Sequence, residues 1–239
     1  MLKSLQKAFK VKEVRDRLLY TFMMLVVIRI GCCLPIPGVD PSYLHDFFSN
    51  LQSSGMGFFN AITGGSFSSM SIFALSITPY ITSSIIMQLL TIAIPKLEEM
   101  QKDGEDGRKK IAEYTRYLTV GLALFESCAM AVGLGGKGLL LEDHRNVWGY
   151  LTVVAAMTAG SALLMWIGER ITDNGVGNGI SIVLLINIVS GTPQDMMTLY
   201  ERFMAGKSVA VATVACIIVL AIIIAIFVFV IILNDGVRK

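Results

Sequence analysis

The chain has 239 residues, of which 54% are hydrophobic and only 16% are charged. A soluble domain typically carries about 25% charged residues, so this composition excludes an ordinary soluble protein and indicates a membrane protein. The net charge of +2 says little by itself, because the distribution of basic residues carries the information in membrane proteins.

Six stretches of the chain are apolar enough to be predicted as membrane spans. A helix crosses a bilayer core of roughly 30 Å with about 20 predominantly apolar residues. In chain order, the predicted spans are residues 18–34, 71–94, 117–136, 147–168, 180–195 and 208–233. The sequence therefore predicts an all-α polytopic membrane protein.

The region between the first two spans is nearly uncharged but lacks the pattern of one helix. Residues 46–94 carry one acidic residue, Asp46, and no Lys or Arg, while residues 55–65 are apolar, short and interrupted by glycines. Irregular backbone survives at membrane depth only where it is buried in protein or lines a water-filled cavity. This half-segment predicts a protein with a path through its middle. Pro79, in the first half of the second span, is expected to kink that span or let it flex.

Lysine and arginine residues gather on one side of the predicted membrane. Segment 1–17 and loop 95–116 hold six each, and Arg170, Arg238 and Lys239 bring that side to fifteen, against four on the other. Cytoplasmic loops carry an excess of Lys and Arg. Both termini are therefore predicted to face the cytoplasm.

No constellation of residues predicts catalysis, a bound metal or a cofactor. The two histidines, His45 and His144, lie outside the predicted spans, and the four cysteines lack the spacing of metal ligands. Residues 133–138 match the dinucleotide-binding pattern G-x-G-x-x-G, but they follow a membrane span, whereas that pattern requires a preceding strand. We predict a protein that is not an enzyme.

Two polar residues interrupt otherwise apolar spans: Gln88 in the second and Glu126 in the third. An ionisable group is costly within the membrane, so it usually faces the interior of a helix bundle or a cavity. A hydrogen bond between Gln88 and Glu126 across a helix interface would lower that cost. The alternative is that Glu126 lies near the membrane surface and reaches the lipid headgroups.

A glycine-rich turn, residues 168–181, leads into the fifth span. Three glycines in five residues permit left-handed or closely packed backbone, and Asn178 and Ser181 are candidates to cap the helix that follows. The alternative is an ordinary tight turn between antiparallel helices.

The charged loop 95–116 places the basic residues Arg108, Lys109 and Lys110 next to a membrane span. Such a cluster most often contacts anionic lipid. The alternative is a cytoplasmic partner, including RNA phosphate.

Several longer stretches resemble the SecY family, whose members form the central subunit of the bacterial protein-conducting channel. The resemblance extends from about residue 14 to the end of the chain. The matching blocks are residues 35–40 (PIPGVD), 71–90 (SIFALSITPYITSSIIMQLL), 107–111 (GRKKI), 114–117 (YTRY) and 166–181 (WIGERITDNGVGNGIS). The resemblance implies a SecY-type helical bundle that opens across the membrane for secreted chains and sideways for apolar segments.

The resemblance also implies roles for individual residues. A short half-helix near residues 56–67 resembles the plug that closes the pore from outside, and the constriction ring falls on the second and fifth spans. The second and third spans resemble one wall of the lateral gate. The implied plug residues are Gly57, Phe58, Phe59, Ile62, Gly64 and Gly65, the ring residues are Ile77, Ile81, Ile180 and Leu184, and the gate residues are Thr82, Gln88 and Glu126.

The partners implied by the resemblance are SecE-like and SecG-like small membrane subunits, signal peptides and nascent chains. A SecA motor ATPase or a ribosome is expected on the cytoplasmic side, where Arg108, Lys109 and Lys110 are candidates to contact it or anionic lipid. The expected location is the bacterial inner (plasma) membrane.

The chain departs from the SecY family in its number of spans. SecY has ten spans in two inverted five-helix halves, whereas six are predicted here. We interpret residues 1–17 as a cytoplasmic N-terminal segment, 18–195 as the first five-helix half, and 196–239 as an external loop, the sixth span and a cytoplasmic end. A C-terminal half on a second chain, or a missing remainder, would be needed to enclose a pore.

The leading hypothesis is a protein-conducting channel subunit. A non-conducting assembly or regulatory subunit with the same fold stays open as a second class. A small-solute secondary transporter would show convergent polar groups at the centre of several spans. Since the implied ring positions are aliphatic and only Glu126 is clearly ionisable, the sequence disfavours a transporter.

Overall fold

The computed structural model describes residues 11–40, 60–141, 145–203 and 209–236. These residues are mostly helical, and among them β-structure is limited to two isolated bridges. The chain divides into two compact units, Met1–Ser190 and Gly191–Lys239. The predicted all-α architecture is therefore confirmed.

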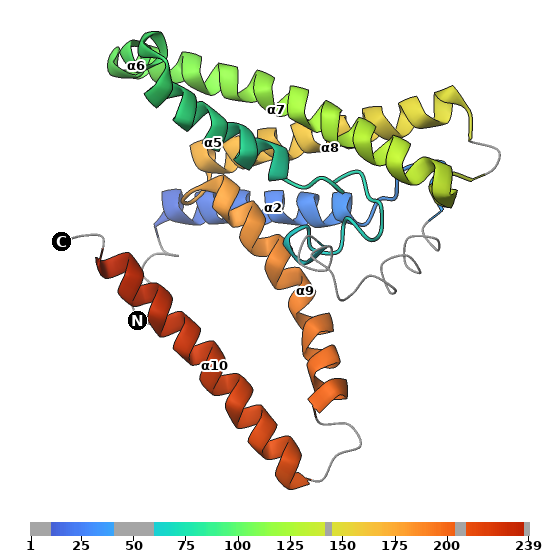
Figure 1. The fold of residues 1–239 in the computed structure, drawn as a ribbon. Coiled ribbons are helices and arrows are strands. Elements are labelled where there is room, and N and C mark those ends of the chain that lie inside the picture. The colour runs from blue at the N-terminus through green and yellow to red at the C-terminus, as the bar shows by residue number, and fades with distance from the viewer. Residues whose placement is uncertain (1–10, 41–59, 142–144, 204–208, 237–239) are drawn as a thin grey trace. The chain divides into compact units, whose positions relative to one another are not determined.

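The first unit is a bundle of helices. α2 (Lys12–Cys32) packs against α8 (Val147–Asn174), which lies antiparallel beside α7 (Glu105–Leu134), and α5 (Thr78–Ala93) packs against α7 (Figure 1). The first turns of α9 (Gly179–Phe203) complete this unit. Buried apolar side chains from these helices form two clusters, one of which also contains Ile36 and Val39 and, at the end of the π-helical turn η1 (Gly135–Leu139) and just after it, Leu139 and Leu140.

The second unit contains the rest of α9 and helix α10 (Val209–Gly236). Most of the large aliphatic side chains of α10 from Ile217 to Leu233 are exposed, as expected of a helix that meets lipid. By length and composition, two helices of the described residues qualify as membrane spans, Val147–Asn174 and Ile217–Asn234, and the bent pair α5–α6 makes a third if it is counted as one.

Proline positions explain where α5 begins and ends. Pro79 occupies the first turn of α5, where its missing N–H costs nothing. The predicted kink at Pro79 is therefore wrong: the helix starts there, and residues 71–77 of the predicted span are irregular. At the other end Ile94, which precedes Pro95, adopts an extended conformation, as residues before proline prefer.

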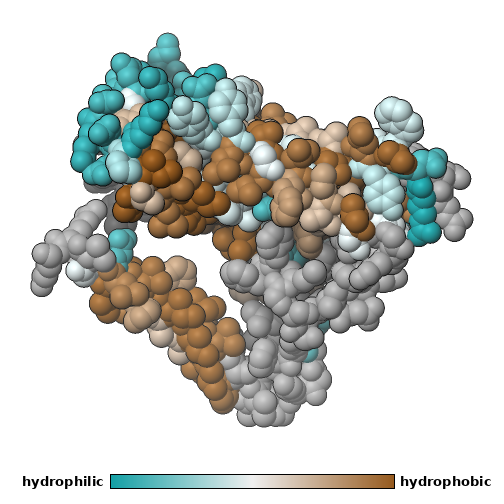
Figure 2. Space-filling view, turned by 45° about the horizontal axis from the view of Figure 1, so that its top comes forward, coloured by the Kyte–Doolittle hydropathy of each residue, from teal (hydrophilic) through white to brown (hydrophobic). Residues whose placement is uncertain are grey.

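A sharp bend separates α5 from the short helix α6 (Pro95–Lys102), whose axis turns by 101°. Gly104, with φ of 82°, then reverses the chain into α7, whose first turn carries Glu105 and Asp106. Acidic side chains are favourable at a helix N-terminus. Figure 2 shows hydrophilic residues gathered around this hairpin, and we call this end of the bundle the basic end because it includes Arg108, Lys109 and Lys110.

Residues 60–62 are helical and lead into an irregular segment that runs to residue 77, just before α5, and most of residues 66–77 are buried. The segment satisfies part of its own hydrogen bonding: Oδ1 of Asn60 accepts from the Ser68 N–H at 3.0 Å, and the hydroxyls of Ser68 and Ser69 both donate to the Gly65 carbonyl at 3.0 Å. The sequence predicts irregular backbone for residues 55–65, whereas residues 71–77 belong to a predicted span and are irregular instead.

Candidate functional site

The four residues of the implied constriction ring lie in one apolar cluster. Ile77, at the start of α5, is fully buried, and Ile81, one turn later, is partly buried. Ile180 and Leu184 have the same spacing on α9 and are also partly buried. Residues four apart lie on one face of a helix, so each helix presents a pair of aliphatic side chains to this cluster.

Two glycines allow these helices to meet. A Cβ atom at Gly168 of α8 would lie 2.7 Å from Cδ1 of Ile180 and 3.5 Å from Cδ1 of Ile77. A Cβ atom at Gly179 of α9 would collide with the carbonyl group of Gly168. The backbones of α8 and α9 are therefore in contact beside the ring residue Ile180, and a larger residue at Gly179 would force them apart.

The glycine-rich turn is held by specific hydrogen bonds. Gly177 has φ of 70°, a conformation that favours glycine. Oδ1 of Asn178 accepts from the N–H groups of Ile180 at 3.0 Å and Ser181 at 3.4 Å, which confirms the predicted cap at Asn178. Ser181 is only a donor in this cap, so its prediction as a capping side chain is wrong.

Two threonines tie the same turn to neighbouring helices. Oγ1 of Thr21 in α2 accepts from the Val176 N–H at 3.1 Å, and Oγ1 of Thr172 in α8 accepts from the Gly179 N–H at 2.9 Å. The turn therefore fixes the start of α9, and with it the positions of Ile180 and Leu184.

A hollow of about 520 Å³ opens above the ring residues toward the basic end. Ile81 and Ile180 line it beside side chains from α5, α7, α8 and the turn before α9. Its polar lining includes Gln88, Arg116, Glu169, Thr172, Asp173 and Asn178. A polar hollow thus adjoins the apolar cluster that contains the four implied ring residues.

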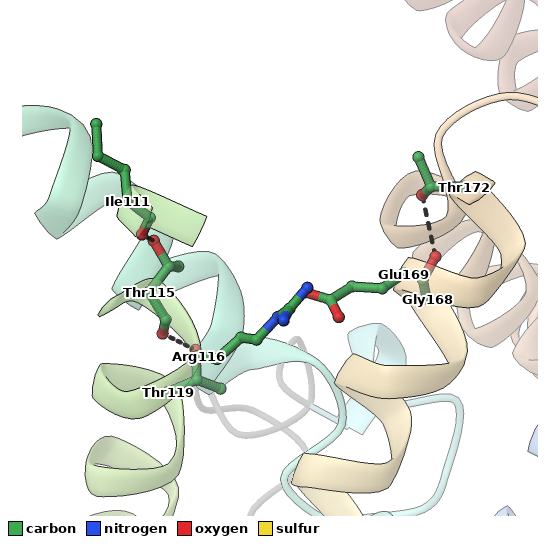
Figure 3. Close-up of polar contacts among 7 residues, drawn as sticks. All are labelled: Ile111, Thr115, Arg116, Thr119, Gly168, Glu169 and Thr172. Atoms are coloured by element: carbon green, nitrogen blue, oxygen red, sulfur yellow. Dashed lines mark hydrogen bonds and ion pairs between the residues drawn. The ribbon is translucent and has the colours of Figure 1, made fainter. Parts of the chain in front are cut away.

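An ion pair crosses this hollow. Nε of Arg116 in α7 donates to Oε1 of Glu169 in α8 at 2.8 Å, and Figure 3 shows the two side chains extended toward each other. Arg116 precedes the apolar stretch of α7, and its hydrogen bond to Glu169 raises the pKa of Arg116 while partial burial opposes that rise. Half of the Arg116 side chain is exposed, so the pair contributes at most about 1 kcal/mol.

The implied gate residues do not form a polar pair. Thr82 is exposed and its hydroxyl donates to the Thr78 carbonyl of its own helix at 3.1 Å. Gln88 lies level with Thr115 in a second hollow between α5 and α7. Glu126 is half-buried and is eleven residues further along α7, a distance of about 16 Å in a helix. The predicted bond between Gln88 and Glu126 is therefore wrong.

The implied plug residues are described in part. Gly57, Phe58 and Phe59 lie outside the described residues. Ile62 is the last helical residue of this stretch and is partly buried, so a half-helix reaching residue 67 is wrong at its C-terminal end. The other two implied plug residues, Gly64 and Gly65, have φ of 65° and 81°.

Gly64 packs directly on α9, because a Cβ atom there would lie 2.7 Å from the Asn187 carbonyl oxygen. The sequence patterns did not identify Asn187 as a contact of the irregular segment, because a single polar residue within an apolar span does not indicate its partner.

The basic residues Arg108, Lys109 and Lys110 are all exposed on the first turns of α7.

Comparison with known proteins identifies the family. Residues 71–239 match the SecY family model. The protein translocase subunit SecY of Pseudomonas aeruginosa is 40% identical over 95% of this chain and 50% of its own length. The corresponding values are 39%, 100% and 56% for Bacillus licheniformis, and 39%, 95% and 51% for Escherichia coli K12. The chain spans about half the length of these curated relatives, and it belongs to the SecY family.

Proposed function

We propose that this chain forms the N-terminal part of a protein-conducting channel in a membrane. The observation that carries the proposal is the convergence of Ile77, Ile81, Ile180 and Leu184 in one apolar cluster next to a polar hollow. An unfolded chain would enter the hollow while hydrated and then pass between aliphatic side chains.

The chemistry of the ring suits such a substrate. Aliphatic side chains make no specific hydrogen bonds, so they accept a passing chain of any sequence. When idle, a hydrophobic constriction opposes ions because it dewets. A small-solute transporter would instead present convergent polar groups at this level, whereas Ile77, Ile81, Ile180 and Leu184 are all aliphatic.

The basic end is assigned to the cytoplasm of a bacterium, with the chain in its inner membrane. The excess of Lys and Arg at this end supports that orientation, and both termini then face the cytoplasm. Arg108, Lys109 and Lys110 are exposed there, where a motor ATPase, a ribosome or anionic lipid would meet them.

Sideways release of apolar segments would use the interface of α5 and α7. The exposed face of α5 carries Ile85, Leu89 and Ile92, which a signal segment or lipid could contact. Each Leu or Ile of an inserting segment gains only about 0.3–0.6 kcal/mol, so release should need several of them. The proposed complex also includes the rest of the channel and small SecE-like and SecG-like subunits.

Photo-crosslinking in membrane vesicles tests the proposal. A photoreactive amino acid at Ile81 or Leu184 should crosslink to a secretory chain stalled in transit. Leu185 is the matched control, because it follows Leu184 on α9 but is 61% exposed on another face. Equal crosslinking from Leu184 and Leu185, or none from either ring position, would favour a non-conducting assembly subunit.

A further inference from the structure

A buried hydrogen bond joins α9 to Ser76, the residue of the irregular segment that precedes the ring residue Ile77 in sequence. Nδ2 of Asn187 donates to Oγ of Ser76 at 3.0 Å, and Asn187 is only 1% exposed. Oδ1 of Asn187 is buried without a hydrogen-bond partner. An unused buried oxygen is unfavourable, so an apolar residue would serve packing alone better than asparagine does.

Ser76 has a strained backbone that its neighbours hold in place. Its φ is 52°, in the left-handed region that non-glycine residues seldom adopt. The Ser76 N–H donates to the Phe73 carbonyl at 2.8 Å, and Oγ of Ser161 in α8 donates to the Ser76 carbonyl at 3.4 Å. Such strain persists only where the surroundings fix it, and Asn187 supplies the contact from α9.

Asn187 contacts the same segment at a second place. Its carbonyl oxygen lies where a Cβ atom of Gly64 would approach to 2.7 Å, and this oxygen also accepts from Oγ of Ser190 at 2.6 Å. One residue of α9 therefore touches Gly64, in the implied plug, and Ser76, which immediately precedes the ring residue Ile77.

We propose that Asn187 is a positioning residue: it holds Ser76 in its left-handed conformation, which keeps Ile77 buried in the ring, and it links this position to Gly64. The inference rests on the proposed function, because the placement of Ile77 bears on transport only if the apolar cluster is the constriction.

Thiol labelling of a cysteine in place of Ile77 measures its burial directly. The four native cysteines are changed to alanine, and the chain is labelled in its membrane with a charged maleimide. Asn187→Ala should raise the labelling rate roughly five- to tenfold, the factor expected for loss of one buried hydrogen bond. The double variant with Ser76→Ala should label no faster than the faster single variant, because both changes remove the same bond.

Ser76→Gly separates the bond from the backbone strain. Glycine accepts the left-handed conformation, so this variant should label more slowly than Ser76→Ala although both lack the hydroxyl. It also provides the test if Asn187→Ala does not reach the membrane. Equal labelling of Ser76→Gly and Ser76→Ala would overturn the proposed role of the strained conformation.

Ser127→Ala is the matched control, since it removes a part-buried 2.9 Å hydrogen bond to Thr158 between α7 and α8. It should lower thermal stability without changing the labelling rate, and labelling as fast as that of Asn187→Ala would overturn the inference.

The ion leak through the membrane caused by Ile77→Ala tests the constriction separately. If Asn187→Ala speeds labelling but Ile77→Ala causes no ion leak, Asn187 is a positioning residue and the constriction is rejected. If Ile77→Ala causes ion leak but Asn187→Ala does not speed labelling, only the role of Asn187 is rejected.

Discussion

Replacing Gly179 by alanine should separate α8 from α9 and destabilise the protein. The new Cβ atom would collide with the carbonyl group of Gly168 and lie 2.9 Å from Cβ of Ile171. A backbone carbonyl cannot rotate away as a flexible side chain can, so the helices must shift. Overpacking of this kind typically costs about 1–3 kcal/mol.

Gly121→Ala is the control, because it makes the same chemical change on α7. No atom lies within 4 Å of a Cβ built at Gly121, and alanine is favoured over glycine within a helix by about 1 kcal/mol. Gly179→Ala should therefore lower the free energy of unfolding, and Gly121→Ala should raise it. Their difference should be about 2–4 kcal/mol, the sum of these two effects.

Unfolding of the purified chain in detergent, followed by heat or denaturant, measures this difference. A disulfide between cysteines placed at Ile77 and Ile180 reports the geometry, and it should form more slowly in Gly179→Ala. If Gly179→Ala is as stable as the unaltered chain or is stabilised like Gly121→Ala, the close contact of α8 and α9 is refuted.

Four further results are expected from substitutions of polar residues. Exchanging the charges of Arg116 and Glu169 should restore most of what either single reversal loses, with a coupling of at most about 1 kcal/mol in a double-mutant cycle; a larger coupling would contradict their partial exposure. Asn178→Ala should destabilise the start of α9 by about 1 kcal/mol in the same unfolding assay, and an unchanged midpoint would show that the cap is dispensable. Substitutions at Gln88 and Glu126 should be additive, because the two residues are well separated along the bundle. Glu126→Leu should shift the hydrophobicity that a signal segment needs for export, and unchanged export of weak signals would exclude a gate role for Glu126.

Features encoded locally could be predicted from the sequence. A helix overlaps each of the six predicted spans, because a long apolar run has few other ways to satisfy its backbone in a membrane. The cap at Asn178 was also predictable, since it depends on residues two and three positions away. Pro79 was misread because a proline in an apolar run fits a kink as well as a helix start, and only the path of residues 71–77 decides between them.

Contacts between distant residues could not be predicted in this way. Arg116 and Glu169 are 53 positions apart, and Ser76 and Asn187 are 111 apart. Their pairing depends on how the helices pack, and no spacing rule connects them. The predicted pair of Gln88 and Glu126 failed for the same reason: both interrupt apolar runs, but the sequence does not fix their relative height along the bundle.

The internal bonding of residues 60–69 has a mechanical consequence. Asn60 with Ser68, and Gly65 with both Ser68 and Ser69, are bonded to each other more than to the surrounding helices. An ordinary loop displaced from this position would lose its hydrogen bonds to its neighbours. Its peptide groups would then be unpaired in a medium without water, at a cost of several kcal/mol for each group. If residues 60–69 act as the plug that the resemblance implies, the segment would leave and return with these internal hydrogen bonds intact. Each displacement would then break only its contacts with the surrounding helices.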